Sequence, residues 1–210
     1  MSHSSLRKKL IPLLLLCTVF LSACGAKNET PEAAATNALN AVKAVDMATI
    51  QKYFGSDTDL FNAGQQTEEN TSAEDKAFIE TIVKNLTFEV VSSSIDGDKA
   101  TVSVAITNTD MSAIFAQYLQ VIFQEAFQYA FLPEEQRPSE EEMAQLYMQR
   151  FQELMAKEDN PTVTTNLDMS LTKNENTWLI TADPALLDAI FGGLISSMEG
   201  FTDSLNSPLT

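Results

Sequence analysis

The sequence predicts one α+β domain in which helices accompany two antiparallel strand pairs. Apolar residues recur at helical spacing before residue 84, over 110–159 and after residue 183. Between these segments, around 86–106 and 163–180, apolar and polar residues alternate as they do in strands with one wet face. We therefore expect N-terminal helices packed on an antiparallel sheet of about four strands, an α-hairpin inserted over 110–159, and a C-terminal helix.

The first 23 residues have the composition of a lipoprotein signal peptide. Three basic residues at 7–9 precede the apolar stretch 10–21, which is shorter than the roughly 20 residues that a membrane span needs. The stretch ends in Leu21-Ser22-Ala23-Cys24, which resembles the lipobox of lipoprotein signal peptidase. We expect cleavage after Ala23, acylation of Cys24 (palmitate among the chains), a short tether over 24–29, and a lipid-anchored location on the extracytoplasmic face of the cell membrane.

The predicted mature chain is strongly acidic. Removal of 1–23 takes away three basic residues and leaves 187 residues with 10 basic and 29 acidic side chains, a formal charge of −19. Such a surface repels phosphate backbones and anionic headgroups, so nucleic acid is not an expected partner. The length suits one domain, which we place at 30–200 and follow with a flexible tail over 201–210.

Few groups in the mature chain could perform covalent chemistry. The only histidine, His3, and Cys17 both lie in the predicted signal, and Cys24 would be acylated. This composition excludes cysteine and serine–histidine nucleophiles and zinc sites of the Cys/His type, and we expect neither a metal nor another cofactor. Carboxylates, tyrosines and lysines remain as acid–base groups.

The segment before residue 84 predicts three helices. Thr30-Pro31-Glu32 is typical of a helix start, and Asp46 is the expected cap of a second helix that stops at Gly55. After a polar loop over 56–70, Thr71 and Glu74 fit the capping box of a third helix. The apolar residues carried by these helices are Leu39, Val42, Val45, Ile50, Tyr53, Phe54, Phe78, Ile79, Ile82 and Val83.

The two alternating segments each predict a β-hairpin. Asp96-Gly97 predicts the turn of the first hairpin, and Asn174-Glu175-Asn176 that of the second. The residues expected on the inward face are Leu86, Phe88, Val90, Val102, Val104, Ile106, Leu167, Met169, Trp178 and Ile180. By the same alternation, Glu89 and Asp168 should face water.

The insertion between the hairpins contains the most unusual segment. Asp110 should begin a helix that runs to about Phe131, apolar over most of its circumference, with four glutamines as the main polar stripe. Core packing against the following helix is the plainer interpretation of its apolar surface, and a ligand pocket or a protein contact is the alternative. Ser139 and Glu142 predict a capping box for a second helix with one apolar and one acidic side. A final helix should start at Asp183-Pro184 and carry apolar residues to Ile195.

Two stretches carry a family resemblance. The opening Pro31…Ala38-Leu39…Val45-Asp46…Tyr53-Phe54 and the hairpin Lys173-Asn174-Glu175-Asn176-Thr177-Trp178-Leu179-Ile180 resemble nuclear transport factor two-like (cystatin-like) domains. Together with the ending Leu186-Leu187-Asp188-Ala189-Ile190-Phe191-Gly192-Gly193, they are similar to Gram-positive lipoproteins whose domain has no assigned function. The resemblance implies a cone of helices on a curved antiparallel sheet, with a possible pocket between them. It implies no activity, since this superfamily contains both enzymes and binding domains.

The candidate catalytic residues have plainer structural interpretations. Tyr53 fits a core position on an amphipathic helix, and Asp57 fits a solvated loop. Asp96-Gly97-Asp98 lacks the acid spacing of a calcium loop, and the run 140–142 suits a helix N-terminus, where acids are favourable.

Two functional hypotheses therefore stand. The favoured one is a non-catalytic, membrane-tethered module that binds a small apolar ligand or an envelope protein through Phe115, Tyr118, Ile122 and Phe127. The alternative is a small-molecule isomerase or dehydratase that uses a buried carboxylate and a tyrosine in the cone. A carboxylate with a raised pKa inside the cone would favour the enzyme.

Overall fold

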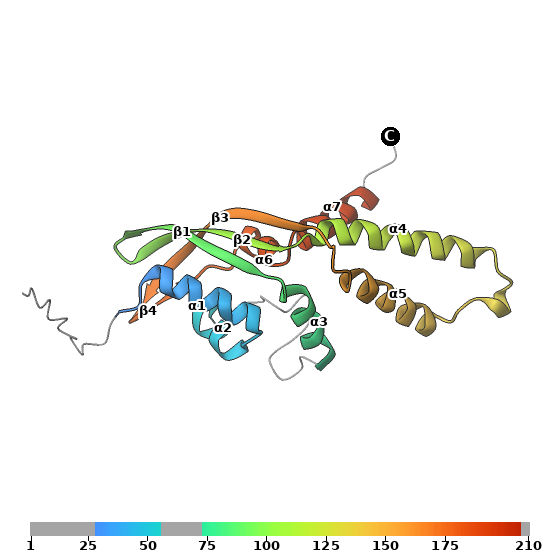
Figure 1. Cartoon of the computed structure of the whole chain (residues 1–210), viewed down its shortest axis with the longest axis horizontal. Coiled ribbons are helices and arrows are strands. Elements are labelled where there is room, and N and C mark those ends of the chain that lie inside the picture. The colour runs from blue at the N-terminus through green and yellow to red at the C-terminus, as the bar shows by residue number, and fades with distance from the viewer. Residues whose placement is uncertain (1–27, 56–72, 207–210) are drawn as a thin grey trace, which may run out of the picture.

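The computed structural model describes residues 28–55 and 73–206 (Figure 1). Cys24, Asp57, the loop over 56–70 and Thr71 lie outside the described residues. None of the described helices is long and apolar enough to cross a membrane. The elements are α1 (Pro31–Ala44), α2 (Met47–Phe54), α3 (Ala73–Val83), β1 (Thr87–Asp96), β2 (Lys99–Thr109), α4 (Met111–Ala130), a 3-10 turn (Glu134–Gln136), α5 (Glu140–Met155), β3 (Thr162–Asn174), β4 (Thr177–Ile180), α6 (Pro184–Ile190) and α7 (Leu194–Asn206).

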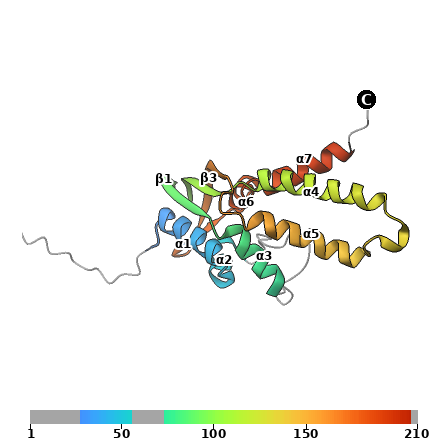
Figure 2. The same ribbon diagram turned by 45° about the vertical axis from the view of Figure 1, so that its right-hand side comes forward.

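The four strands form one antiparallel sheet in the order β1-β2-β3-β4. Helices α1, α2 and α6 contact the strands, and Figures 1 and 2 show them gathered under the curved sheet. The predicted α+β class is thus confirmed. The helical insertion leaves the sheet after β2 and returns to it at β3, as the change in periodicity predicted.

All the predicted helix starts except the one at Thr71 are confirmed by their caps. At each one, a side-chain oxygen of the cap accepts a hydrogen bond from the backbone N–H three residues further on, which satisfies a donor that the helix leaves unpaired. The second helix of the insertion also has the reciprocal bond of a capping box. The capping residues are Thr30, Asp46, Asp110, Ser139 and Asp183.

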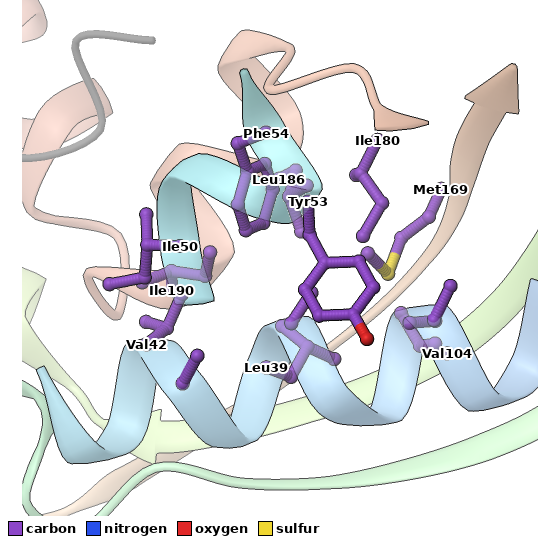
Figure 3. Packing of buried hydrophobic residues seen from close by; sticks show 14 of the residues in the cluster. Leu39, Val42, Ile50, Tyr53, Phe54, Val104, Met169, Ile180, Leu186 and Ile190 are labelled. Atoms are coloured by element: carbon purple, nitrogen blue, oxygen red, sulfur yellow. The ribbon is translucent and has the colours of Figure 1, made fainter. Parts of the chain in front are cut away.

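The main core lies between the sheet and the helices α1, α2 and α6. Figure 3 shows Leu39 and Tyr53 packed with Met169 of β3 and Leu186 of α6. The predicted parity of the strands is confirmed, since their inward residues are buried or packed on this core, whereas Glu89 and Asp168 are exposed. The strand residues that are fully buried include Val102, Val104, Ile106, Met169, Leu171, Trp178 and Ile180.

The end of the chain differs from the prediction of one last helix. Gly192 and Gly193 both adopt positive φ and divide the segment into α6 and α7. A Cβ on Gly192 would lie 2.0 Å from the carbonyl oxygen of Thr109, so only glycine permits this close approach. The carboxylate of Asp188 then accepts the backbone N–H of Ser196 at 3.0 Å and caps the new helix. Since α7 continues to Asn206, residues 201–206 are helical and do not form the predicted flexible tail.

Candidate functional site

Helices α4 and α5 form an antiparallel pair, which we call the arm (residues 111–155). Figures 1 and 2 show it projecting from the sheet, at the opposite end of the molecule from residue 28. Its base is closed where the backbone N–H of Asp110 donates to the carbonyl of Pro161 at 2.8 Å. The arm therefore leaves and rejoins the sheet at one point, and the rest of its length extends beyond the sheet.

The root of the arm is a second, smaller core. It combines residues of α3, α4 and α5, and α7 covers a further side. Phe201 of α7 contacts the ring of Phe115 with 6.0 Å between centroids and that of Phe123 with 6.4 Å. The buried members of this cluster are Ile82, Met111, Ile114, Leu154 and Met155.

Aromatic rings and one ion pair join the two helices of the arm. The ring of Tyr118 meets that of Phe151 edge to face at 5.6 Å. Burial, with a smaller contribution from Tyr147, raises the pKa of Tyr118. Further out, Glu125 accepts a hydrogen bond from Arg150 at 2.8 Å. Glu125 is the only charged residue of α4, and this contact turns it toward α5.

The opposite side of α4 is exposed and uncharged, and we call it the α4 outer face. Its aromatic members become more exposed toward the tip, from 58% at Phe123 to 67% at Phe127 and 74% at Phe131. The rings of Phe127 and Phe131 contact one another at 4.8 Å. The full set is Gln117, Gln120, Phe123, Gln124, Phe127, Gln128 and Phe131.

The four binding residues predicted from the sequence do not share this surface. Phe127 belongs to it, whereas Phe115, Tyr118 and Ile122 are half-buried. Phe123 and Phe131, which the prediction did not include, are exposed on this face. A helical projection of α4 could have placed Phe123 and Phe127 beside the glutamines, but it could not show that α7 covers Phe115.

Tyr53 meets a carboxylate, but not in the middle of the cone. Its buried ring extends its hydroxyl toward Glu29, to which it donates at 2.6 Å. Thr177 and Asn37 donate to the same carboxylate at 2.5 and 2.8 Å. Burial alone would raise the pKa of Glu29, yet these bonds together with the charge of Lys52 lower it. Sequence reasoning assigned Glu29 to the tether and missed this cluster.

The other acidic motifs have structural roles. Asp96-Gly97-Asp98 forms the tight turn between β1 and β2, with Gly97 at φ +60°. The acids at 140–142 occupy the first turn of α5, and bonds from Ser139 lower the pKa of Glu142. Over the described ranges, 28–55 and 73–206, no cluster of histidine, cysteine and acidic residues could hold a metal ion.

No family model and no curated protein matches this chain. Among solved structures, a Bacillus subtilis protein described as a lipoprotein (ycdA) aligns with a TM-score of 0.48 and 14% identity over 79% of this chain. The chain spans a little over half of that protein, 56% of its length. A Streptomyces galilaeus protein described as a hydroxylase (AclR) aligns at TM-score 0.30 and 15% identity, covering 75% of this chain and 83% of its own. An epoxide hydrolase of M. tuberculosis aligns with a TM-score of 0.28 and 13% identity, and the alignment covers 86% of this chain and 100% of that protein.

Proposed function

We propose that this protein is an extracytoplasmic binding module, anchored to the cell membrane by a lipid on Cys24, which captures an envelope protein through the α4 outer face and catalyses no reaction. The observation that carries the proposal is the exposed row of phenylalanines and glutamines on α4. Three phenylalanines more than half exposed on one helix are unusual in a monomer and typical of an interaction surface.

The character of this face suits a protein partner. A small apolar ligand is normally enclosed in a concave site, whereas the phenylalanines of the α4 outer face are exposed on a helix. The glutamines can donate and accept hydrogen bonds without bringing a charge into the contact. Because the mature chain carries −19, an uncharged strip is where another acidic envelope protein could approach with the least repulsion.

Several observations support a non-catalytic role. Some described carboxyl groups, such as Glu29 and Glu32, have a pKa that differs from the ordinary value, and in each case the pKa is lowered. A carboxyl group with a lowered pKa stays ionised, which suits a structural hydrogen-bond acceptor better than a general acid. The strand acids Glu89 and Asp168 face away from the core. The alternative enzyme would need a carboxylate beside a tyrosine within the cone, and Tyr53 is engaged at its edge with Glu29.

Photo-crosslinking in living cells tests the surface. A benzophenone amino acid at Phe127 should yield a discrete protein adduct. The matched control is Val91, which is 63% exposed but lies on β1, where no adduct is expected. The double variant Phe123→Gln/Phe131→Gln should remove the adduct while the protein stays folded, with only a small fall in the urea midpoint from the lost contact of Phe123 with Phe201. Equal adducts at Phe127 and Val91, or none at either, would reject the α4 outer face.

The anchor is tested separately by palmitate labelling. Wild type and Cys17→Ala should incorporate the label, and Cys24→Ala should not. Persistent labelling of Cys24→Ala would show that the assignment of the lipidated residue is wrong.

A further inference from the structure

The chain just after the predicted anchor is joined to the second hairpin by backbone bonds. The N–H of Glu29 donates to the carbonyl of Asn176 at 3.0 Å. The carbonyl of Glu29 accepts the indole N–H of Trp178 at 2.9 Å. Trp178 is 95% buried, so this second contact holds residue 29 against a side chain that belongs to the main core.

The side chain of Glu29 adds a contact to each neighbouring element. One oxygen accepts from Asn37 of α1 and Tyr53 of α2, and the other accepts from Thr177 of β4. The hydroxyl of Tyr53 in turn accepts from Lys52 at 3.0 Å. A carboxylate with three donors makes charge-assisted bonds, which are stronger than neutral ones. We call this set of contacts the Glu29 clamp.

The clamp lies close to the predicted lipid. Five residue steps separate Cys24 from Glu29, so even a fully extended chain spans at most about 18 Å. Without the clamp, the chain after Cys24 would first meet the domain at α1, which begins at Pro31, so the domain would have more freedom to reorient relative to the lipid. With it, the end that carries Thr177 and Trp178 must remain near the headgroups.

The arm extends away from the end of the domain that carries the Glu29 clamp. Figures 1 and 2 place its tip, at Glu134–Gln136, at the far end of the molecule's long axis from residue 28. A helix of 20 residues, such as α4, adds about 30 Å to that separation. Acidic residues at 134–135 and 140–142 surround the tip and would be repelled by an anionic bilayer if the arm lay down on it.

We propose that the Glu29 clamp mounts the domain in one orientation, with the β3–β4 end at the membrane and the arm held away from it. This inference rests on the proposed function for the anchor at Cys24. It deepens that proposal by stating the class of partner: a polypeptide that reaches the α4 outer face from the space beyond the membrane surface, and not a lipid or a membrane-embedded helix.

Energy transfer to the bilayer tests the orientation. The mature chain 24–210 is coupled through Cys24 to a maleimide lipid in phosphatidylglycerol–phosphatidylethanolamine vesicles that contain an acceptor lipid. A donor dye is placed by amber suppression either at Asn174, in the β3–β4 turn, or at Gln136, at the tip of the arm; both residues are exposed and neither side chain belongs to the clamp. We expect transfer from position 174 to exceed that from position 136 several-fold.

Substitutions then separate the clamp from other carboxylates. Glu29→Ala should reduce the difference in energy transfer between the two dye positions. Glu29→Gln keeps a hydrogen-bond acceptor and should reduce this difference less. Glu32→Ala is the matched control, because the carboxylate that it removes from α1 accepts a hydrogen bond from Ser93 and is not part of the Glu29 clamp. Circular dichroism confirms the fold of each variant.

Two results would overturn the inference. Equal transfer from the two positions in wild type would show that the domain tumbles. Stronger transfer from position 136 would show that the arm lies on the membrane, with its phenylalanines as a lipid contact. Chemical coupling supplies the anchor, so a failure here is distinct from a failure of palmitate labelling, which would reject the anchor itself.

Discussion

The sheet end and the arm contain similar apolar side chains but bury them to different degrees. At the sheet end, α1 and α2 pack on four strands, and even the large side chain of Tyr53 is 98% buried. On α4, burial falls with distance from the root, from Ile114, which is fully buried, to Phe131, which is mostly exposed. An antiparallel pair of helices covers only one side of each helix, whereas α1 and α2 contact both the sheet and one another.

This contrast assigns stability to one region, and under the proposed function it leaves binding to the other. The main core holds one end of the molecule together, and Phe191 packs both against it and against the second core at the root of the arm. Beyond the root, the exposed phenylalanines contribute little to folding and are available to a partner.

The largest effect is expected at Trp178. Its replacement by alanine removes a buried ring and leaves the carbonyl of Glu29 without its indole donor, so the free energy of unfolding should fall by about 3–5 kcal/mol. Phe131→Ala on the arm removes an exposed ring and should change it by no more than about 0.5 kcal/mol. Urea denaturation measures both values, and similar losses at the two positions would contradict the division.

The junction between the regions is tested at its glycines. Gly192→Ala imposes a positive φ on alanine, which costs about 1–3 kcal/mol, and places Cβ against the backbone oxygen of Thr109, which adds to the cost. Gly200, within α7, has open space around its Cβ position, so Gly200→Ala should stabilise the protein by up to about 1 kcal/mol. Thermal unfolding compares the stability of the two variants. A melting temperature of Gly192→Ala equal to that of wild type would show that the backbone at the junction can move to accommodate a Cβ.

The pH dependence of stability should report on the Glu29 clamp. Because the pKa of Glu29 is lowered in the folded state, its contribution is fully present above the unfolded value, near 4.5, and is lost as the pH falls through the folded pKa. Glu29→Gln does not titrate. Its free energy of unfolding should therefore lie below that of wild type at pH 7, and the gap should narrow as the pH falls below 4.5. Urea midpoints at pH 7 and at pH values below 4.5 measure the gap, and a constant gap would show that the carboxylate charge has no role.

Local chemistry was enough to predict most elements of the fold. Thr30, Asp46 and Asp183 are helix caps because their oxygens can accept a nearby backbone N–H, and this requires no tertiary contact. The burial of Trp178 followed from alternation along a strand. The insertion was predictable because the apolar period changes at its two ends.

The sequence could not predict features that residues distant in the chain decide. The break at Gly192 depends on the approach of Thr109, some 80 residues away, which no local pattern in the last helix reveals. Phe115 was predicted as a binding residue because α4 is apolar, and only the position of α7 shows that Phe201 contacts it. Phe131 was expected at the end of that helix, but its exposure could not be predicted without knowing where the covering helices stop.

Residue type and local periodicity were sufficient for the α+β class, the order of the elements, the facing of the strands and the acidic composition of the predicted mature chain, which has no histidine. Tertiary structure decided which apolar residues of α4 are covered and which are exposed. It also decided the role of Glu29, a residue that the sequence places in a tether. Its three donors come from α1, α2 and β4, and only the packing of those elements brings Asn37, Tyr53 and Thr177 to one carboxylate.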